Sequence, residues 1–279
     1  MIEVHMKTSI PRSFTSIGLA LGFFVLWVII MAPLLAPLAN NAPSPESVWR
    51  RLGYEVAPLV AVLFATWVMI RRFDKQTTWP RICTEKRWIQ STAAGVVVGL
   101  GWLFGAMALM SATTTLHIGA SQSVPWAIVW IAAAAINVVM QEYLVRGYLF
   151  SMLARRHSVA AASVVTTLVF VAMHGFEGGV LGVLNVTAAG AVFTVLLVRT
   201  GSLLAPIIAH ALWNVVGAIG FGVVSLGGVY PHIMDLSYSG IASLESSATT
   251  LAASCLTAVL LWRFVPQHKA KTQNAARAT

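Results

Sequence analysis

Three short groups of polar residues interrupt the apolar stretches of this sequence and could carry out chemistry. They are Gln141, Glu142 and Arg146; Phe170 and His174; and His210 and Asn214. A carboxylate or a histidine can take a proton from water, and an imidazole or amide N–H can stabilise an oxyanion. These residue types make the three groups candidates for a functional site.

Each group contains two residues four positions apart, so both members lie on one face of a helix. Glu142 can therefore pair with Arg146 on its own helix, which lowers the free energy cost of burying either charge. His210 and Asn214 likewise point into one space. Because the three groups fall in separate helices, the two histidines and the carboxylate can meet only inside a bundle.

A structural interpretation of each group is also open. A Glu–Arg pair at this spacing can clamp two helices, and a single histidine inside a membrane is often a hydrogen-bonded packing residue. Three such groups in one chain favour a functional site. We expect Asn137 and Asn185 to bridge helices rather than to do chemistry, although Asn137 lies one turn before Gln141.

The elements that position these residues are predicted to be transmembrane helices. Hydrophobic residues make up 58% of the 279 residues and charged residues only 10%, against about 45–50% and 25% in ordinary globular chains. Apolar stretches of about the 20 residues that a spanning helix needs run over 16–39, 54–70, 91–113, 124–149, 158–176, 180–198, 202–223 and 246–264. We expect an all-α polytopic membrane bundle of about eight transmembrane helices.

Lysine and arginine positions predict which helix ends face the cytoplasm. The connection after the second span is rich in them, with Arg71, Arg72, Lys75, Arg81, Lys86 and Arg87. When this connection is placed inside, only Arg50 and Arg51 of the 18 basic residues fall outside, and Arg146 falls within a span. Both termini are therefore predicted to be cytoplasmic.

The net charge of +9 is then explained by the inner surface of a bilayer rather than by nucleic acid. The expected partners are the lipid bilayer and a membrane-associated peptide substrate, with no nucleic acid. The two cysteines, Cys83 and Cys255, have no spacing typical of a metal site. No repeated halves of the kind expected of a transporter are visible.

The three groups, in this order, resemble a known family. Its pattern is Glu-Glu-x-x-x-Arg, then Phe-x-x-x-His, then His-x-x-x-Asn or -Asp, on successive helices. Here the pattern reads QEYLVRGYL at 141–149, FVAMHG at 170–175 and TGSLLAPIIAHALWN at 200–214. The sequence is similar to the CAAX proteases and bacteriocin-processing enzymes, also called type II CAAX prenyl endopeptidase-like or Abi proteins.

The resemblance implies an intramembrane protease core over about residues 90–225. Residues 1–89 would form an N-terminal two-helix region with a basic cytoplasmic loop, and 226–264 an outer loop and the last helix. Residues 265–279 are expected to be a disordered cytoplasmic tail. The resemblance places the protein in the plasma (inner) membrane of a bacterium.

The resemblance also implies roles for the residues. In the family the glutamate pair is thought to activate a water, assisted by the first histidine, while the second histidine and the asparagine stabilise the oxyanion. Glu142, His174, His210 and Asn214 are thus the expected catalytic residues, with Gln141, Arg146 and Phe170 in support. Gln141 departs from the pattern, because a glutamine cannot act as a base at neutral pH.

Two alternatives remain open. Glu142, His174 and His210 would also be a legitimate catalytic zinc set, although the pairing of Glu142 with Arg146 favours a site without metal. The loss of the first glutamate favours a second alternative, a catalytically impaired member that acts as a non-enzymatic immunity or chaperone-like factor in the membrane.

Overall fold

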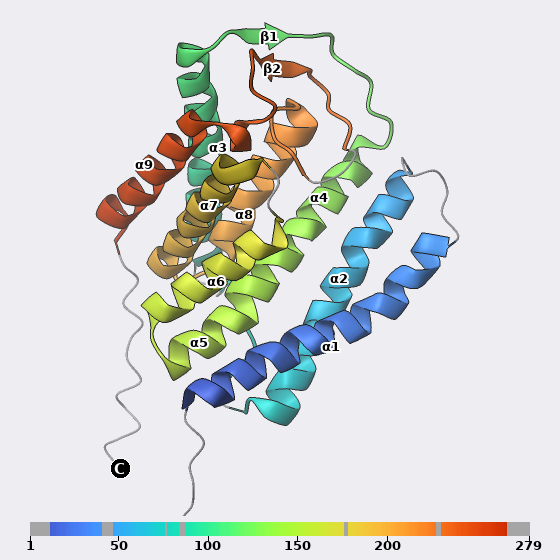
Figure 1. Cartoon of the computed structure of the whole chain (residues 1–279), viewed down its shortest axis with the longest axis vertical. Coiled ribbons are helices and arrows are strands. Elements are labelled where there is room, and N and C mark those ends of the chain that lie inside the picture. The colour runs from blue at the N-terminus through green and yellow to red at the C-terminus, as the bar shows by residue number, and fades with distance from the viewer. Residues whose placement is uncertain are drawn as a thin grey trace, which may run out of the picture.

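The computed structural model describes residues 12–40, 47–75, 77–83, 87–175, 178–226 and 230–266. It is a bundle of α-helices with one small two-stranded sheet at one end (Figure 1). The helices are α1 (Arg12–Asn40), α2 (Val48–Val68), α3 (Trp88–Thr113), α4 (Ala127–Glu142), α5 (Phe150–Arg156), α6 (Val159–Met173), α7 (Gly179–Thr200), α8 (Leu204–Asn214) and α9 (Ala248–Phe264). The predicted fold class is confirmed.

Three helices continue into π-helical segments, in which the turn is wider than in an α-helix. These segments are Met69–Phe73 after α2, Tyr143–Leu149 between α4 and α5, and Val215–Gly220 after α8. Two of them adjoin polar residues predicted for the site, since Glu142 and Asn214 are the last residues of α4 and α8. Such segments are frequent at functional sites.

The two-stranded sheet was not predicted from the sequence. Strands β1 (Leu116–Ile118) and β2 (Leu236–Tyr238) pair in antiparallel register at the end of the bundle drawn uppermost in Figure 1. A short 3-10 turn, Leu244–Ser246, then leads into α9.

Five helices of the described chain are long and apolar enough to cross a membrane: Thr15–Leu38, Val48–Phe73, Trp88–Thr113, Ala127–Arg156 and Gly179–Thr200. The other three predicted spans correspond to shorter apolar helices, Val159–Met173, Leu204–Gly220 and Ala248–Phe264. The number of eight spans and the cytoplasmic position of both termini remain predictions. The predicted disordered tail falls mostly outside the described residues, which end at 266.

Apolar side chains cover the outside of the bundle as well as its core. On α1, Ile17, Leu21, Val25 and Ile29 are all more than half exposed and follow one another at four-residue spacing. A stripe of this kind would be unfavourable in water but is expected of a helix whose outer face contacts lipid tails.

At the end of the bundle opposite the two-stranded sheet, ion pairs connect the helices. Asp74, which is fully buried, accepts a 2.8 Å hydrogen bond from Nη2 of Arg156 and lies 3.9 Å from Arg155. His157 and Ser16 form a 2.9 Å hydrogen bond between the start of α6 and α1. The basic segment after α2 and the basic last turn of α5 thus lie at the same end of the bundle, as the alternation of spans predicts.

Helix α8, which carries His210, packs closely on α3 through two glycines. A Cβ atom at Gly95 would lie 2.7 Å from the carbonyl oxygen of Ala205, and one at Gly99 would lie 2.8 Å from that of Ala209. Only glycine permits this approach, in the manner of small-residue packing between membrane helices.

We expect Gly99→Ala to destabilise the protein by about 1–3 kcal/mol, the typical cost of overpacking, because the new Cβ would meet backbone rather than a flexible side chain. The melting temperature of the purified protein would measure this effect. Gly101→Ala is the matched control, since nothing lies within 4 Å of a Cβ there and alanine is the better helix former. Equal melting temperatures for the two variants would contradict the prediction.

Candidate active site

The side chains of Glu142, Arg146 and His210 meet inside the bundle. Oε1 of Glu142 accepts a 2.8 Å hydrogen bond from Nη1 of Arg146 and a 2.9 Å hydrogen bond from Nδ1 of His210. Their exposed fractions are 0%, 2% and 3%. The predicted pairing of Glu142 with Arg146 is confirmed, and α8 brings His210 to the same oxygen.

Arg146 joins this cluster to α6 and α7. Its Nη2 donates to the backbone carbonyl of Gly190 at 3.2 Å, and its guanidinium carbon lies 4.3 Å from the centre of the Phe170 ring. A Cβ at position 190 would lie 3.3 Å from Phe170 and 3.5 Å from Nη2 of Arg146. Glycine therefore gives both groups the space that they occupy.

Aromatic rings fix the two histidines. The Phe193 ring stacks on His210 with centroids 4.6 Å apart and planes at 21°. Phe170 contacts both imidazoles, at 4.3 Å from His174 and 5.8 Å from His210. His174 therefore lies beside the cluster without a direct bond to Glu142 among the described contacts.

His174 has a defined hydrogen-bonding state. It is the residue that ends α6, and its Nδ1 lies 2.7 Å from the carbonyl oxygen of Phe170. A carbonyl only accepts, so Nδ1 carries the proton, and Nε2 of the neutral ring is left as an acceptor. His174 is thereby oriented to take a proton through Nε2.

Asn214 is buried one turn after His210 on α8. No hydrogen bond of its side-chain amide is found among the described residues, so the amide is not committed to holding two helices together. Asn185, in contrast, donates to the carbonyl of Ser247 at 2.9 Å and to that of Leu181 at 3.0 Å. The helix-bridging role predicted for Asn185 is confirmed.

Gln141 does not join the Glu142 cluster. Its Nε2 donates to Oδ1 of Asn137 at 2.7 Å, and Nδ2 of Asn137 donates to Oε2 of Glu55 on α2 at 2.6 Å. Asn137 thus links α4 with α2, as its predicted bridging role requires. Glu55 was not among the candidates from the sequence.

Two buried acceptor atoms at the site receive no hydrogen bond from the described protein groups. They are Oε2 of Glu142 and Oε1 of Gln141. Buried polar atoms in native proteins nearly always have a partner. These atoms are therefore suited to accept hydrogen bonds from a water or a substrate.

Residues 123–216 match the family model described as type II CAAX prenyl endopeptidase Rce1-like. The matched segment contains every residue predicted for the site. This part of the chain, 94 of its 279 residues, is therefore similar to the CAAX protease family. No curated protein sequence matches the chain.

The match points to a hydrolase of the CAAX prenyl endopeptidase class. Together with the long apolar helices it also implies a multi-pass membrane location. The matched segment runs from just before α4 to the start of the π-helical segment after α8, so it is shorter than the predicted core of 90–225.

Zinc does not fit the observed arrangement. Among the residues that the structure describes, no three histidine, cysteine, aspartate or glutamate side chains are grouped so that they could hold a metal ion. Oε1 of Glu142 is bonded to the Arg146 guanidinium, whose charge would repel a divalent cation. The groups at this site are those of acid–base chemistry and hydrogen bonding.

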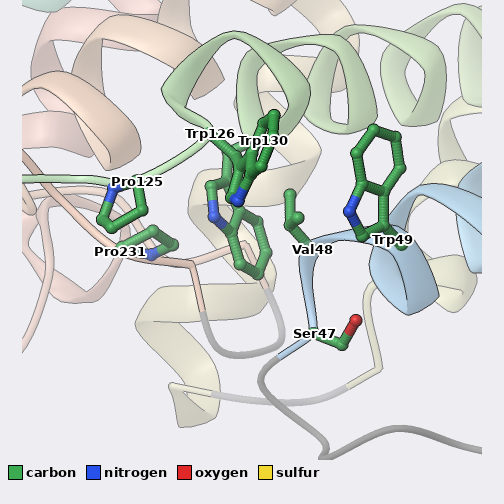
Figure 2. A pocket seen from close by; sticks show the side chains of 7 residues that line it. All are labelled: Ser47, Val48, Trp49, Pro125, Trp126, Trp130 and Pro231. Carbon is green, nitrogen blue, oxygen red and sulfur yellow. The ribbon is translucent and has the colours of Figure 1, made fainter.

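A cavity of about 470 Å³ lies elsewhere in the described part of the chain (Figure 2). It is lined by Ser47, Val48, Trp49, Pro125, Trp126, Trp130 and Pro231. None of these residues belongs to the Glu142 cluster, and all lie near the beginnings of α2 and α4 or in the loop before β2. Tryptophans near the ends of spanning helices are typical of the membrane–water interface.

One residue of the site region was missed although a sequence pattern could have identified it. Glu55 is an acidic residue at the start of an otherwise apolar span and follows Arg51 by four positions, the same pattern that identified Glu142 and Arg146. Gly190 and Phe193, which complete the surroundings of Arg146 and His210, carry no such signal, because glycine and phenylalanine are common throughout these helices.

Proposed function

We propose that this protein is an intramembrane endopeptidase that cleaves a membrane-associated peptide with a water activated by Glu142. One observation supports this proposal. Two donors, Arg146 and His210, hydrogen-bond to one oxygen of the buried carboxylate, while its other oxygen receives no hydrogen bond from the described residues. A general base needs such a geometry: the carboxylate is held in place and keeps one oxygen free to accept a proton.

The reaction begins when Oε2 of Glu142 takes a proton from water as the oxygen attacks the peptide carbonyl carbon. The carbonyl π electrons move to its oxygen, which becomes the oxyanion of a tetrahedral intermediate. When the intermediate collapses, the C–N bond breaks and the leaving nitrogen receives the proton from Glu142. His174 can assist the proton transfers through Nε2. General-base help of this kind contributes about 10²–10⁴-fold.

His210 and Asn214 would stabilise the oxyanion. A protonated His210 donates from both ring nitrogens, from Nδ1 to Glu142 and from Nε2 to the oxyanion. The uncommitted amide of Asn214 lies one turn further along α8 and supplies a second donor. Arg146 orients Glu142 through a direct charge contact, and Phe170 supports the Arg146 guanidinium.

The proposed substrate class rests on the long apolar helices and on the similarity to CAAX prenyl endopeptidases. A peptide carrying a lipid, or one inserted in the membrane, would bring its scissile bond to a site buried among helices. A prenylated CAAX-type tail and a bacteriocin-like precursor are the two candidates. We place the protein in the plasma (inner) membrane of a bacterium.

The test is cleavage of a quenched prenylated-peptide reporter, and of a bacteriocin-precursor peptide, by the purified protein and its Gln141→Glu variant. Turnover by the wild type supports the proposal. Silence of the wild type with turnover by Gln141→Glu would overturn it in favour of the non-enzymatic immunity or chaperone-like factor. That alternative is favoured by the glutamine that replaces the first glutamate of the family.

Asn214→Ala should lower kcat by about 10²–10³-fold, the measured effect of removing one oxyanion donor, with little change in melting temperature. The matched control is Asn185→Ala, which removes a helix-bridging amide on α7 and should lower the melting temperature but not kcat. A loss of kcat in both variants alike would show that Asn214 acts only through the fold.

A further inference from the structure

Glu55 is a second buried carboxylate, separate from the Glu142 cluster. Its exposed fraction is 4%, and Oε1 lies 2.6 Å from Nη2 of Arg51. The Tyr230 hydroxyl donates to the same oxygen at 3.4 Å and accepts a 2.9 Å hydrogen bond from Nε of Arg51. Burial and the charge of Glu55 raise the pKa of Tyr230 to about 12, so this hydroxyl keeps its proton at neutral pH.

A carboxylate at the end of a hydrogen-bonded chain determines the direction of every bond that follows. Glu55 can only accept, so the Asn137 amide must present Nδ2 to it at 2.6 Å, with Oδ1 on the other side. Oδ1 in turn accepts from Nε2 of Gln141 at 2.7 Å. The Gln141 amide is left with Oε1 facing away from Asn137 as an acceptor.

This fixed orientation explains how a glutamine can stand where the family has a glutamate. A free glutamine amide can turn either its donor or its acceptor toward a ligand. When its nitrogen is committed to Asn137, only the buried acceptor Oε1 remains available. Gln141 then offers the hydrogen-bond acceptor of a carboxylate, although not its ability to take a proton.

We propose that Glu55 is a positioning residue for the peptidase reaction: through Asn137 it holds Gln141 with Oε1 as acceptor for the second hydrogen of the attacking water. This inference rests on the proposed function, in which the first hydrogen goes to Glu142. The chain Glu55–Asn137–Gln141 thus connects an ion pair at the beginning of α2 with the residue next to the catalytic base.

The test moves the charge along the chain. Glu55→Gln removes the acceptor-only end, so the Asn137 and Gln141 amides lose their enforced direction. In the double variant Glu55→Gln/Asn137→Asp, the new aspartate accepts from residue 55 on one side and from Gln141 on the other, which restores the direction. Asp235→Asn, which alters a carboxylate 3.6 Å from His232, is the control outside the chain.

We expect Glu55→Gln to lower kcat by about 3–10-fold, the worth of one neutral hydrogen bond, with KM unchanged. The double variant should recover kcat, and Asp235→Asn should match the wild type. A merely structural role for Glu55 predicts no such recovery. Failure of the double variant to recover kcat, or a wild-type kcat in Glu55→Gln, would overturn the inference.

A second readout does not depend on turnover. Protein labelled with ¹⁵N-glutamine gives side-chain amide signals by NMR, and the signal of Gln141 is assigned by its disappearance in Gln141→Glu. We expect slow hydrogen exchange of this amide in the wild type and the double variant, and fast exchange in Glu55→Gln. Unchanged exchange in Glu55→Gln would overturn the inference. Absence of cleavage by every variant would instead overturn the proposed function, while the NMR result still decides the orientation of Gln141.

Asn137→Ala serves if Glu55→Gln does not fold. It breaks the same chain one link further in and leaves Glu55 paired with Arg51 and Tyr230. The same losses of kcat and of exchange protection are expected, and wild-type values for both would overturn the inference.

Discussion

Glu142→Gln will reduce peptide cleavage by about 10²–10⁴-fold, the contribution of a positioned general base. The glutamine has almost the same shape, and its oxygen can still accept from Arg146 and His210. It cannot take a proton from water. Initial-rate measurements with the peptide that the wild type cleaves would detect the loss as a fall in kcat at little-changed KM.

The control for this variant is Glu245→Gln, which changes a partly buried carboxylate outside the Glu142 cluster to its amide. Glu245 accepts from Nε1 of Trp213 at 3.3 Å, and burial raises its pKa, so the loss of its charge should cost little. We expect wild-type cleavage from this variant. Cleavage by Glu142→Gln at the wild-type rate would contradict the assignment of Glu142 as the base.

The local part of the site could be predicted from the sequence, because it depends on spacing along one helix. Residues four apart share a helix face, so the contact between Glu142 and Arg146 follows from their positions alone. The bond between His210 and Glu142 depends on how α8 packs against α4. The sequence predicted only that these residues would converge, and the close approach permitted by Gly95 and Gly99 was not foreseen.

The position of Gln141 shows where the sequence pattern fails. Neighbouring residues of a helix point about 100° apart, because a turn takes about 3.6 residues. The amide nitrogen of Gln141 therefore reaches Asn137, whereas Oε1 of Glu142 reaches Arg146 and His210, although the family pattern treats the two residues as one pair. The next link, from Asn137 to Glu55, depends on the packing of α2 beside α4, which no motif encodes. The strands of the two-stranded sheet have three residues each, which is too short to show an alternating pattern of polar and apolar residues.

Arg146→Met will be the most destabilising of the changes considered, at about 3–5 kcal/mol, because it leaves the carboxylate of Glu142 buried without its counter-charge. The side chain also loses its bond to the carbonyl of Gly190 and its contact with the Phe170 ring. The midpoint of thermal or denaturant unfolding in detergent would measure this loss. Cleavage should fall as well, since the base is no longer held.

The double variant Glu142→Gln/Arg146→Met separates stability from catalysis. Replacing both members of a buried ion pair is often neutral or even stabilising, because no uncompensated charge remains in the interior. We therefore expect the double variant to unfold close to the wild type and yet to cleave no peptide. A double variant as unstable as Arg146→Met would show that the arginine acts mainly through Gly190 and Phe170. Recovery of cleavage along with stability would show that the buried pair is a structural clamp and that the base lies elsewhere. The expected result, a stable and inactive bundle, would mean that this pair is retained for its chemistry at a cost in burial energy.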